Sequence, residues 1–348
     1  MRASWCSECW ALSPTSSFLA LSAACCVGAR CLNNLNIIKG KPMKPMIRSI
    51  RWLSFAVALI ASAAVHAQTK LNVGYVPTSD FLPAFVAKDV GIFEKKKLDV
   101  TLTRVALAPN VPPAIIAGSL QIGMGTATLL LDTADAGLGL VAIAGTSRMT
   151  DKQPVVSVVA RAGANINSAA DLKGKRVGVP GFRSMMDVSF RKWLLTKGVK
   201  PSEVNIVEAS FPQMRDMLKG GTLDAVAVIE PFRSRITGDQ TGIKVADYLA
   251  ELRPDMLAAM WLAKGDWVTA NAQAVRDFRE SLAEGMTFIA QNPDKAREIE
   301  KKYLGFNAPQ FPPYSLAISA ADLEFFVNIS RDIGMERKVI DLSTLIAK

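Results

Sequence analysis

Short runs of aliphatic and β-branched residues alternate with amphipathic stretches from residue 71 almost to the end of the chain, and this alternation restricts the possible folds most strongly. The first run, residues 71–76, ends at Pro77, and residues 81–90 follow it with apolar side chains spaced as on one face of a helix. Strands that alternate with helices predict parallel sheets with helices on their faces. The further strands predicted in this way cover residues 98–103, 120–124, 140–144, 155–159, 176–179, 204–207, 223–229 and 256–263.

The length of 348 residues predicts two domains, because one hydrophobic core usually serves about 150 residues. The alternation forms two series, and the run at 155–159 between them is interpreted as a strand that leads away from the first sheet. Beyond Pro254 the pattern changes to a return strand and long helices, which we place back on the first sheet. We therefore predict one lobe from residues 68–158 and 255–348 and a second lobe from residues 159–254.

Residues 43–67 have the three parts of a secretory signal peptide. A basic region at 43–51 precedes an apolar region at 52–64, and the small-x-small site ends at Ala67. The apolar region is shorter than the roughly 20 residues of a membrane-spanning helix. We expect cleavage near Ala67 and a periplasmic protein that begins at Gln68, without a lipid anchor, because no cysteine follows the cleavage site.

Residues 1–42 precede a complete export signal, although such a signal belongs at the N-terminus. We interpret this segment as the result of a start codon assigned too far upstream. The alternative is a genuine extension, which would carry all five cysteines. Cys6 and Cys9 have the CxxC spacing of half a zinc or redox site, but no second pair and no βαβ pattern accompany them.

The expected mature chain contains neither cysteine nor histidine, because all five cysteines and the single histidine lie in the first 67 residues. This excludes Ser-His-Asp and Cys-His nucleophiles, thiol redox chemistry, disulfides and Cys/His zinc sites from that part of the chain. Seven of the 41 basic residues but only one of the 31 acidic residues precede Gln68, so the remainder has a net charge of about +4. That charge predicts no nucleic-acid interface. No calcium-loop or phosphate-loop motif is present, and we predict no cofactor.

Three stretches of the mature part are similar to those of a known family. The most specific combines residues 171–179, Asp-Leu-Lys-Gly-Lys-Arg-Val-Gly-Val, with residues 220–232, which end in Glu-Pro-Phe. The other two are residues 74–100 and 114–123. Together they resemble the type II periplasmic-binding proteins of ABC importers, in the branch that binds sulfonates, taurine, nitrate and thiamine precursors. Two departures concern the subfamily, since Lys97 and Gln121 stand where the family usually has Gly and Asp.

The resemblance implies a two-lobed α/β protein, each lobe a mainly parallel sheet flanked by helices, with hinge strands that cross between the lobes. It implies that a small molecule is bound in the cleft and passed to a permease and its ATPase. The protein would be a monomer that meets the membrane only through the permease. An enzyme of the thiamine-precursor synthase type shares this fold, but by resemblance it requires a histidine and a cysteine-rich segment. A sensory periplasmic domain is a third alternative, although no signalling module is attached.

Loops at the carboxyl ends of the predicted strands supply the candidate ligand contacts, because helix N-termini there present free N–H groups. Alternatives stay open for several of them: a helix cap for the loop at 78–80, a solvated side chain for Arg183, and a brace for Glu230. With hydroxyl loops and two arginines at these positions, we predict a small organic anion, a sulfonate or carboxylate, with nitrate or a thiamine-precursor pyrimidine as alternatives. The candidates are Thr78, Ser79, Asp80, Gly125, Thr126, Ala127, Arg148, Phe182, Arg183, Ser184, Phe211 and Glu230.

Overall fold

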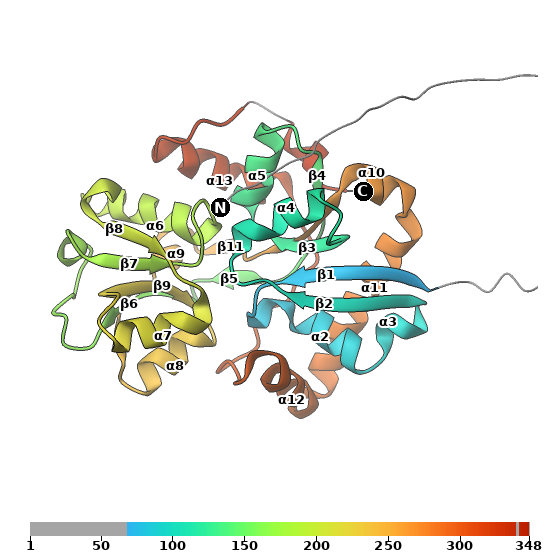
Figure 1. Cartoon of the computed structure of the whole chain (residues 1–348), viewed down its shortest axis with the longest axis horizontal. Coiled ribbons are helices and arrows are strands. Elements are labelled where there is room, and N and C mark those ends of the chain that lie inside the picture. The colour runs from blue at the N-terminus through green and yellow to red at the C-terminus, as the bar shows by residue number, and fades with distance from the viewer. Residues whose placement is uncertain (1–67, 339–340, 348) are drawn as a thin grey trace, which may run out of the picture. The chain divides into compact units, whose positions relative to one another are not determined.

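A computed structural model describes residues 68–338 and 341–347 of the chain (Figure 1). The predictions for the upstream segment, the signal peptide and its cleavage site concern residues 1–67 and lie outside the described residues. The described part contains two separate five-stranded sheets and one two-stranded sheet, with helices packed around them.

The first five-stranded sheet has the strand order β2-β1-β3-β12-β4. The central β1 pairs in parallel with β2 and β3, whereas β12 lies antiparallel between β3 and β4. The strands are β1 (Thr69–Tyr75), β2 (Leu98–Arg104), β3 (Ile122–Gly125), β4 (Leu140–Gly145) and β12 (Met260–Lys264). The helices that follow these strands or return to them are α2 (Leu82–Asp89), α3 (Ile92–Lys95), α4 (Val111–Ile116), α5 (Ala127–Asp135), α10 (Gly265–Ala270), α11 (Ala272–Gln291), α12 (Pro293–Leu304) and α13 (Ala320–Asp332).

The second five-stranded sheet has the order β10-β6-β9-β7-β8. β7 pairs in parallel with β8 and β9, and β6 pairs antiparallel with β9 and β10. The strands are β6 (Val156–Arg161), β7 (Arg176–Val179), β8 (Asn205–Glu208), β9 (Ala225–Ile229) and β10 (Gly242–Ala246). The helices of this part are α6 (Met185–Thr196), α7 (Phe211–Lys219), α8 (Phe232–Gly238) and α9 (Tyr248–Leu252). Short 3-10 helices cover Ser79–Phe81 (η1), Ala108–Asn110 (η2), Ala170–Leu172 (η3), Pro201–Glu203 (η4) and Leu342–Leu345 (η5).

In each large sheet four strands run in the same direction, as the predicted mainly parallel sheets require, and one strand, β12 or β6, is reversed, which the sequence does not predict. The difference arises where the chain crosses between the sheets. The predicted crossing strand at 155–159 is β6, which belongs wholly to the second sheet and enters it antiparallel, so the boundary predicted at residue 158 falls inside a strand. The predicted return strand at 256–263 is divided in two, and its second half enters the first sheet antiparallel as β12.

The two crossing connections pair with each other in the small sheet. β5 (Arg148–Thr150) lies on the outward path and β11 (Asp255–Leu257) on the return path, and they form an antiparallel ladder. Adjacent bonds extend this contact, since the backbone N–H of Thr146 donates to the carbonyl of Ala259 at 3.1 Å. The crossing strands that the family resemblance implies are therefore present as a hydrogen-bonded pair.

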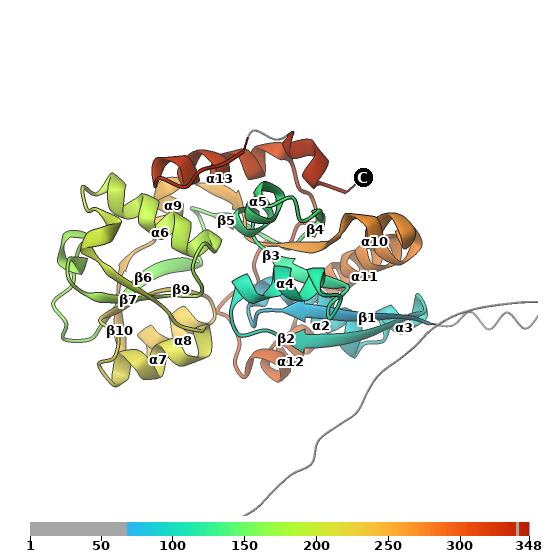
Figure 2. The same ribbon diagram turned by 45° about the horizontal axis from the view of Figure 1, so that its top comes forward.

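Aromatic packing fixes the helices on the first sheet. The ring of Trp261 in β12 meets Phe81 edge-on at 5.0 Å and Phe278 of α11 at 5.5 Å, and Phe278 stacks on Phe93 at 5.6 Å. Such pairs stabilise a core beyond the area that they bury. The C-terminal helix α13 contacts α5 of the first part and α6 of the second (Figure 2).

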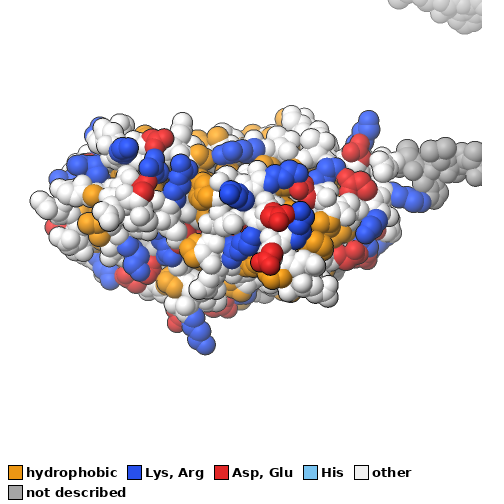
Figure 3. Space-filling view, turned by 90° about the horizontal axis from the view of Figure 1, so that it is seen from below, with side chains coloured by type: hydrophobic (Ala, Val, Ile, Leu, Met, Phe, Trp, Pro, Cys, Tyr) orange, Lys and Arg blue, Asp and Glu red, His pale blue; other side chains and the backbone are white. Residues whose placement is uncertain are grey.

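Two observations on the described residues concern helix hydrophobicity and the distribution of charge on one face. No helix in residues 68–338 and 341–347 is both long and apolar enough to cross a bilayer. On the face drawn in Figure 3, basic side chains are interspersed with acidic ones and form no continuous stripe. This pattern agrees with the small net charge computed for the chain after residue 67.

Candidate ligand-binding site

A cavity of about 50 Å³ lies where the strand ends of the two large sheets meet. The loops that follow β1, β2, β3, β7 and β8 supply most of its wall, so it occupies the carboxyl ends of parallel strands. The wall is mostly apolar and includes four methionines. Its residues are Val76, Thr78, Asp80, Phe81, Ala108, Met124, Thr126, Met149, Pro180, Ser184, Met185, Met186, Phe211, Ile229, Ala258 and Ala259.

Asp80 is the one ionisable residue of this wall. Its side chain is 6% exposed, and its two oxygens each accept one hydroxyl, from Ser147 Oγ at 2.5 Å and from Thr78 Oγ1 at 2.9 Å. Burial raises the pKa of the Asp80 carboxyl, while the hydrogen bonds from Ser147 and Thr78 act in the opposite direction. No ion pair within the described part of the chain involves Asp80.

Two helix N-termini reach the cavity from opposite sheets. Thr126 is the N-cap residue of α5, and its hydroxyl lies 3.0 Å from that of Thr128. Ser184 is the N-cap residue of α6, and its Oγ accepts a long hydrogen bond of 3.4 Å from the N–H of Asp187. The first turn of α6 therefore already has a side-chain acceptor.

Five of the candidates taken from the sequence line the cavity, namely Thr78, Asp80, Thr126, Ser184 and Phe211. Phe211 is held there by stacking on Phe232 at 5.6 Å.

Ser79, Gly125 and Ala127 are neighbours of wall residues but do not belong to the wall themselves. The Ser79 hydroxyl donates to Oε1 of the fully buried Glu300 at 2.6 Å. A side chain at Gly125 would collide with Leu262 of β12, so this glycine permits close strand packing.

Arg148 does not line the cavity. Its Nε and Nη2 donate to the two carboxylate oxygens of Asp255 at 2.7 and 3.0 Å, and Nη2 also donates to Asp322 at 3.1 Å. The guanidinium thus joins β5, β11 and the first turn of α13, which satisfies its charge away from the cavity.

Arg183 and Phe182 also lie outside the wall. Arg183 donates to both oxygens of Asp132 in α5, at 2.8 and 2.7 Å, and so connects the loop after β7 with a helix of the first sheet. Asp132 is shared with the buried Arg337, which also pairs with Asp135 at 2.9 Å. The Phe182 ring is 42% exposed.

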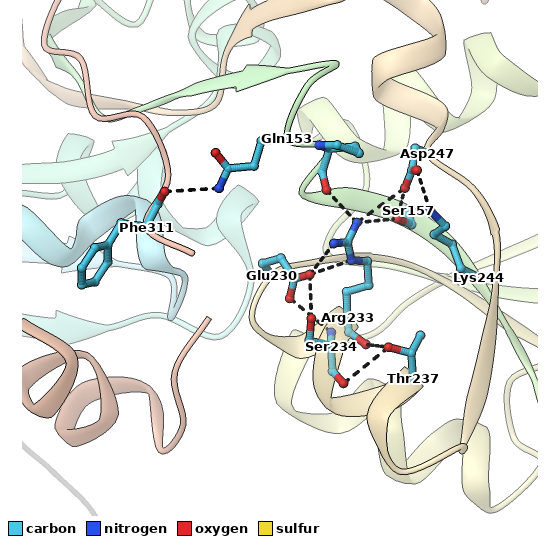
Figure 4. A network of polar contacts seen from close by, with 10 residues as sticks. Gln153, Ser157, Glu230, Arg233, Ser234, Thr237, Lys244, Asp247 and Phe311 are labelled. Carbon is cyan, nitrogen blue, oxygen red and sulfur yellow. Dashed lines mark hydrogen bonds and ion pairs between the residues drawn. The ribbon is translucent and has the colours of Figure 1, made fainter. Parts of the chain in front are cut away.

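Glu230 belongs to a polar network on the second sheet (Figure 4). Its Oε1 accepts from Arg233 Nε at 2.7 Å and from Ser234 Oγ at 2.8 Å, and its Oε2 accepts from the Ser234 N–H at 3.2 Å. Arg233 in turn donates to the carbonyl of Pro154 at 2.7 Å and to Ser157 at 3.1 Å. The network thus connects α8 to the outward crossing segment, and Glu230 does not line the cavity.

Several wall residues were absent from the sequence-based set. The four methionines of the wall are among these missed residues. Hydrophobic periodicity could not distinguish them from core residues, because their side chains are apolar. Ser147, which binds Asp80, does carry a detectable signal, since it follows a predicted strand just as the other hydroxyl loops do. Trp261 does not line the cavity, because its ring is packed within the core between Phe81 and Phe278.

An enclosed cavity at the strand ends of two lobes, with hydrogen-bonded crossing strands beside it, is the arrangement of a two-lobed periplasmic solute-binding protein. The family model described as "NMT1/THI5 like" matches residues 78–296, and the chain belongs to this family. No group of three or more His, Cys, Asp or Glu side chains suited to a metal ion occurs in the part of the chain that the structure covers.

Known relatives agree with this class. A binding protein of Brucella abortus is 24% identical over 290 residues, which are 82% of this chain and 87% of the relative. The nitrate/nitrite binding protein NrtA of Nostoc is 24% identical over 272 residues, 71% of this chain and 61% of that protein. Among solved structures, the alkanesulfonate-binding protein SsuA of Xanthomonas axonopodis has a TM-score of 0.70 at 17% identity, with 80% of this chain and 98% of that chain covered. The names of all three proteins describe binding proteins.

Proposed function

We propose that this chain is the substrate-binding component of an ABC importer. It captures one small solute in the cavity between the lobes and delivers it, chemically unchanged, to a permease and its ATPase. The observation that carries this proposal is the cavity wall, which takes residues from both sheets and can enclose a solute only when the lobes are together. The family and the binding proteins among its relatives support the same function.

The cellular setting belongs to the same proposal. We infer that the protein acts in the periplasm as a monomer, after removal of the segment up to Ala67, because residues 43–67 have the pattern of an export signal. It would meet the membrane only through the permease. Two structural neighbours described as periplasmic, an aliphatic sulphonate binding protein and a nitrate-binding protein, support this location.

An enzyme of the thiamine-precursor synthase type is less well supported. The cavity wall contains one carboxyl group, three hydroxyl side chains and otherwise apolar residues, and it offers no thiol or imidazole. A general base needs a partner that accepts or stabilises the developing charge, and no such partner lines this wall. Reversible binding without turnover is the function that these residues support.

The ligand class predicted from the sequence is a small organic anion, with nitrate or a pyrimidine as alternatives. The N-termini of α5 and α6 at the cavity favour an anion, and the names of the nitrate- and alkanesulfonate-binding neighbours point the same way. The two arginines expected to pair with it are bound to carboxylates elsewhere. The choice between an anion and a nitrogen-containing ligand therefore depends on the charges within the wall, which the next subsection treats.

The proposal is tested with protein that begins at Gln68, screened by thermal shift and titration calorimetry against small anions, amines and heterocycles. A ligand at 100 times its Kd raises the free energy of unfolding by about 2.7 kcal/mol, which such a screen detects readily. Ala259→Leu fills the cavity and should abolish binding, whereas Ala283→Leu on the exposed face of α11 should not. Equal affinity in both variants, or a chemically altered ligand recovered after incubation, would contradict the proposal.

A further inference from the structure

We propose that the cavity selects a mainly apolar solute through a nitrogen, either cationic or bearing N–H groups, that binds the carboxylate of Asp80. This inference rests on the proposed function and names its substrate class. It replaces the organic anion that the loop pattern alone suggested.

The charge of the wall carries the argument. Asp80 is its single ionisable residue, and no lysine or arginine belongs to the wall. The carboxylate accepts the neutral hydroxyls of Thr78 and Ser147, one on each oxygen, and the backbone N–H of Asp80 also stabilises its charge. Each oxygen can accept a second hydrogen bond, so a nitrogen with two N–H groups, or a cationic one, completes the set and compensates the buried charge.

An anion in the same cavity would be opposed by Asp80. Two negative charges that share an enclosed, mostly apolar space repel each other strongly, so an anion binds only if Asp80 takes up a proton. The N-terminus of α6 does not remove this conflict. At α6, the Asp187 carboxylate already accepts the N–H of Arg183 at 2.8 Å, and Ser184 already accepts from Asp187 N.

The apolar part of the wall indicates what surrounds the nitrogen. Met124 and Met149 come from β3 and β5, and Met185 and Met186 open α6, so methionines approach the cavity from both lobes. Methionine side chains adapt to irregular apolar shapes and make favourable contacts with aromatic rings. The cavity of about 50 Å³ is far smaller than a usual ligand site, so these flexible side chains must move when a solute enters.

The neighbouring ionisable groups are paired or neutral, so the pH dependence of ligand binding should come mainly from the protonation of Asp80. On α12, Glu300 is paired with Arg297 at 2.7 Å, and its other oxygen accepts the hydroxyl of Ser79. Tyr314 donates to the carbonyl of Ser79 at 3.2 Å, and burial raises the pKa of its hydroxyl well above the usual value, so it stays neutral. Binding of a cation should therefore weaken as the pH falls, while binding of an anion should strengthen.

The experiment compares compounds that differ only in the charged group, using protein that begins at Gln68. Benzylamine is matched with benzoate and benzenesulfonate, butylamine with butanesulfonate, and 4-aminopyrimidine with pyrimidine. Wild type, Asp80→Asn and the control Asp216→Asn are measured by calorimetry at two pH values. Asp216 is an exposed carboxylate on α7 that pairs with Arg215 at 3.1 Å and does not line the cavity.

We expect the nitrogen compounds to bind and their matched anions to fail. Loss of a charge-assisted hydrogen bond in Asp80→Asn should weaken binding at least about tenfold, with no change in Asp216→Asn. If Asp80→Asn does not fold, as judged by circular dichroism, the matched pairs and the pH response of wild type decide the question.

Two results would overturn the inference, and they differ in what they leave standing. Anions that bind wild type, and bind Asp80→Asn equally or more tightly, would refute the ligand class but keep the proposed function. The absence of binding by every compound, in all three proteins, would refute the proposed function together with the inference.

Discussion

Gly285 sits where α11 crosses α2, and Gly285→Ala is expected to destabilise the protein. A helical glycine usually gains about 1 kcal/mol of stability when it becomes alanine. Here the added Cβ would fall on the carbonyl oxygen of Pro83, with the Pro83 Cα only 3.3 Å away. The obstacle is backbone rather than the flexible end of a side chain, so one helix must move away from the other.

The magnitude follows from two opposing effects. Overpacking of a well-packed core lowers the free energy of unfolding by about 1–3 kcal/mol, and a backbone obstacle belongs at the upper end of this range. Subtraction of the helix-propensity gain of about 1 kcal/mol leaves a net loss of about 1–2 kcal/mol. In a protein of this size each kcal/mol lowers Tm by about 2–4 °C, so we expect a decrease of about 2–8 °C.

The assay is thermal unfolding of Gly285→Ala beside Gly238→Ala. Gly238 ends α8, is exposed, and has no atom near the position of an added Cβ, so its alanine variant should be neutral or more stable by up to about 1 kcal/mol. Displacement of α2 would also shift η1, which carries Asp80, and ligand affinity should fall in Gly285→Ala alone. A Tm for Gly285→Ala equal to or above that of wild type would refute the close seating of α11 on α2.

Three further predictions concern ionisable groups. Burial raises the pKa of the Asp80 carboxyl above its value in the unfolded chain, although the hydrogen bonds from Ser147 and Thr78 act in the opposite direction. The folded state therefore binds the proton more tightly than the unfolded state does. As the pH rises and Asp80 loses this proton, the free energy of unfolding decreases. The Tm of wild type relative to Asp80→Asn should therefore decrease from about pH 4 towards neutrality, and a flat difference would contradict the assignment. Arg183→Ala removes the ion pair with Asp132 that joins the lobes. Because the Arg183 side chain is 56% exposed, we expect ligand affinity to fall by no more than about fivefold. The control Arg215→Ala, which removes an ion pair within one lobe, should leave the affinity unchanged. At Asp322 burial opposes ionisation, but bonds from Ser319 and Arg148 hold the pKa below its usual range, so its contribution is present at neutral pH and lost as the pH falls through the folded pKa. Asp322→Ala should lower the free energy of unfolding by about 1–2 kcal/mol in urea titrations at neutral pH, and an unchanged midpoint would count against the capping role.

Periodicity predicted most of the fold because the strands and helices have strong local patterns. The strand predicted at residues 71–76 corresponds to β1, and the helix predicted at 81–90 corresponds to α2. Strand direction was not predictable, since an apolar run such as residues 155–159 has the same composition in a parallel and an antiparallel position. Only the pairing of β6 with β9 shows its direction.

Part of the cavity wall could be predicted from the sequence, for a physical reason. Hydroxyl and glycine loops after strands identify the edge of a sheet where ligands bind, and Thr78, Thr126 and Ser184 do line the cavity. The destination of a long charged side chain depends on partners far away in the sequence. Arg148 pairs with Asp255 and Asp322, which are 107 and 174 residues away in the sequence, and no local sequence pattern predicts such pairs.

The insertion of β12 between β3 and β4 has a consequence for the order in which the chain can fold. Among the described strands, β4 pairs with β12, so the first sheet stays incomplete until residues 260–264 have left the ribosome. The second sheet is drawn from one continuous segment, β6 to β10, and can close earlier. Pairing between such distant segments is intrinsically slow. The first sheet of such a chain can therefore be completed only after about three quarters of the residues have been synthesised, whereas the second sheet does not depend on the last quarter.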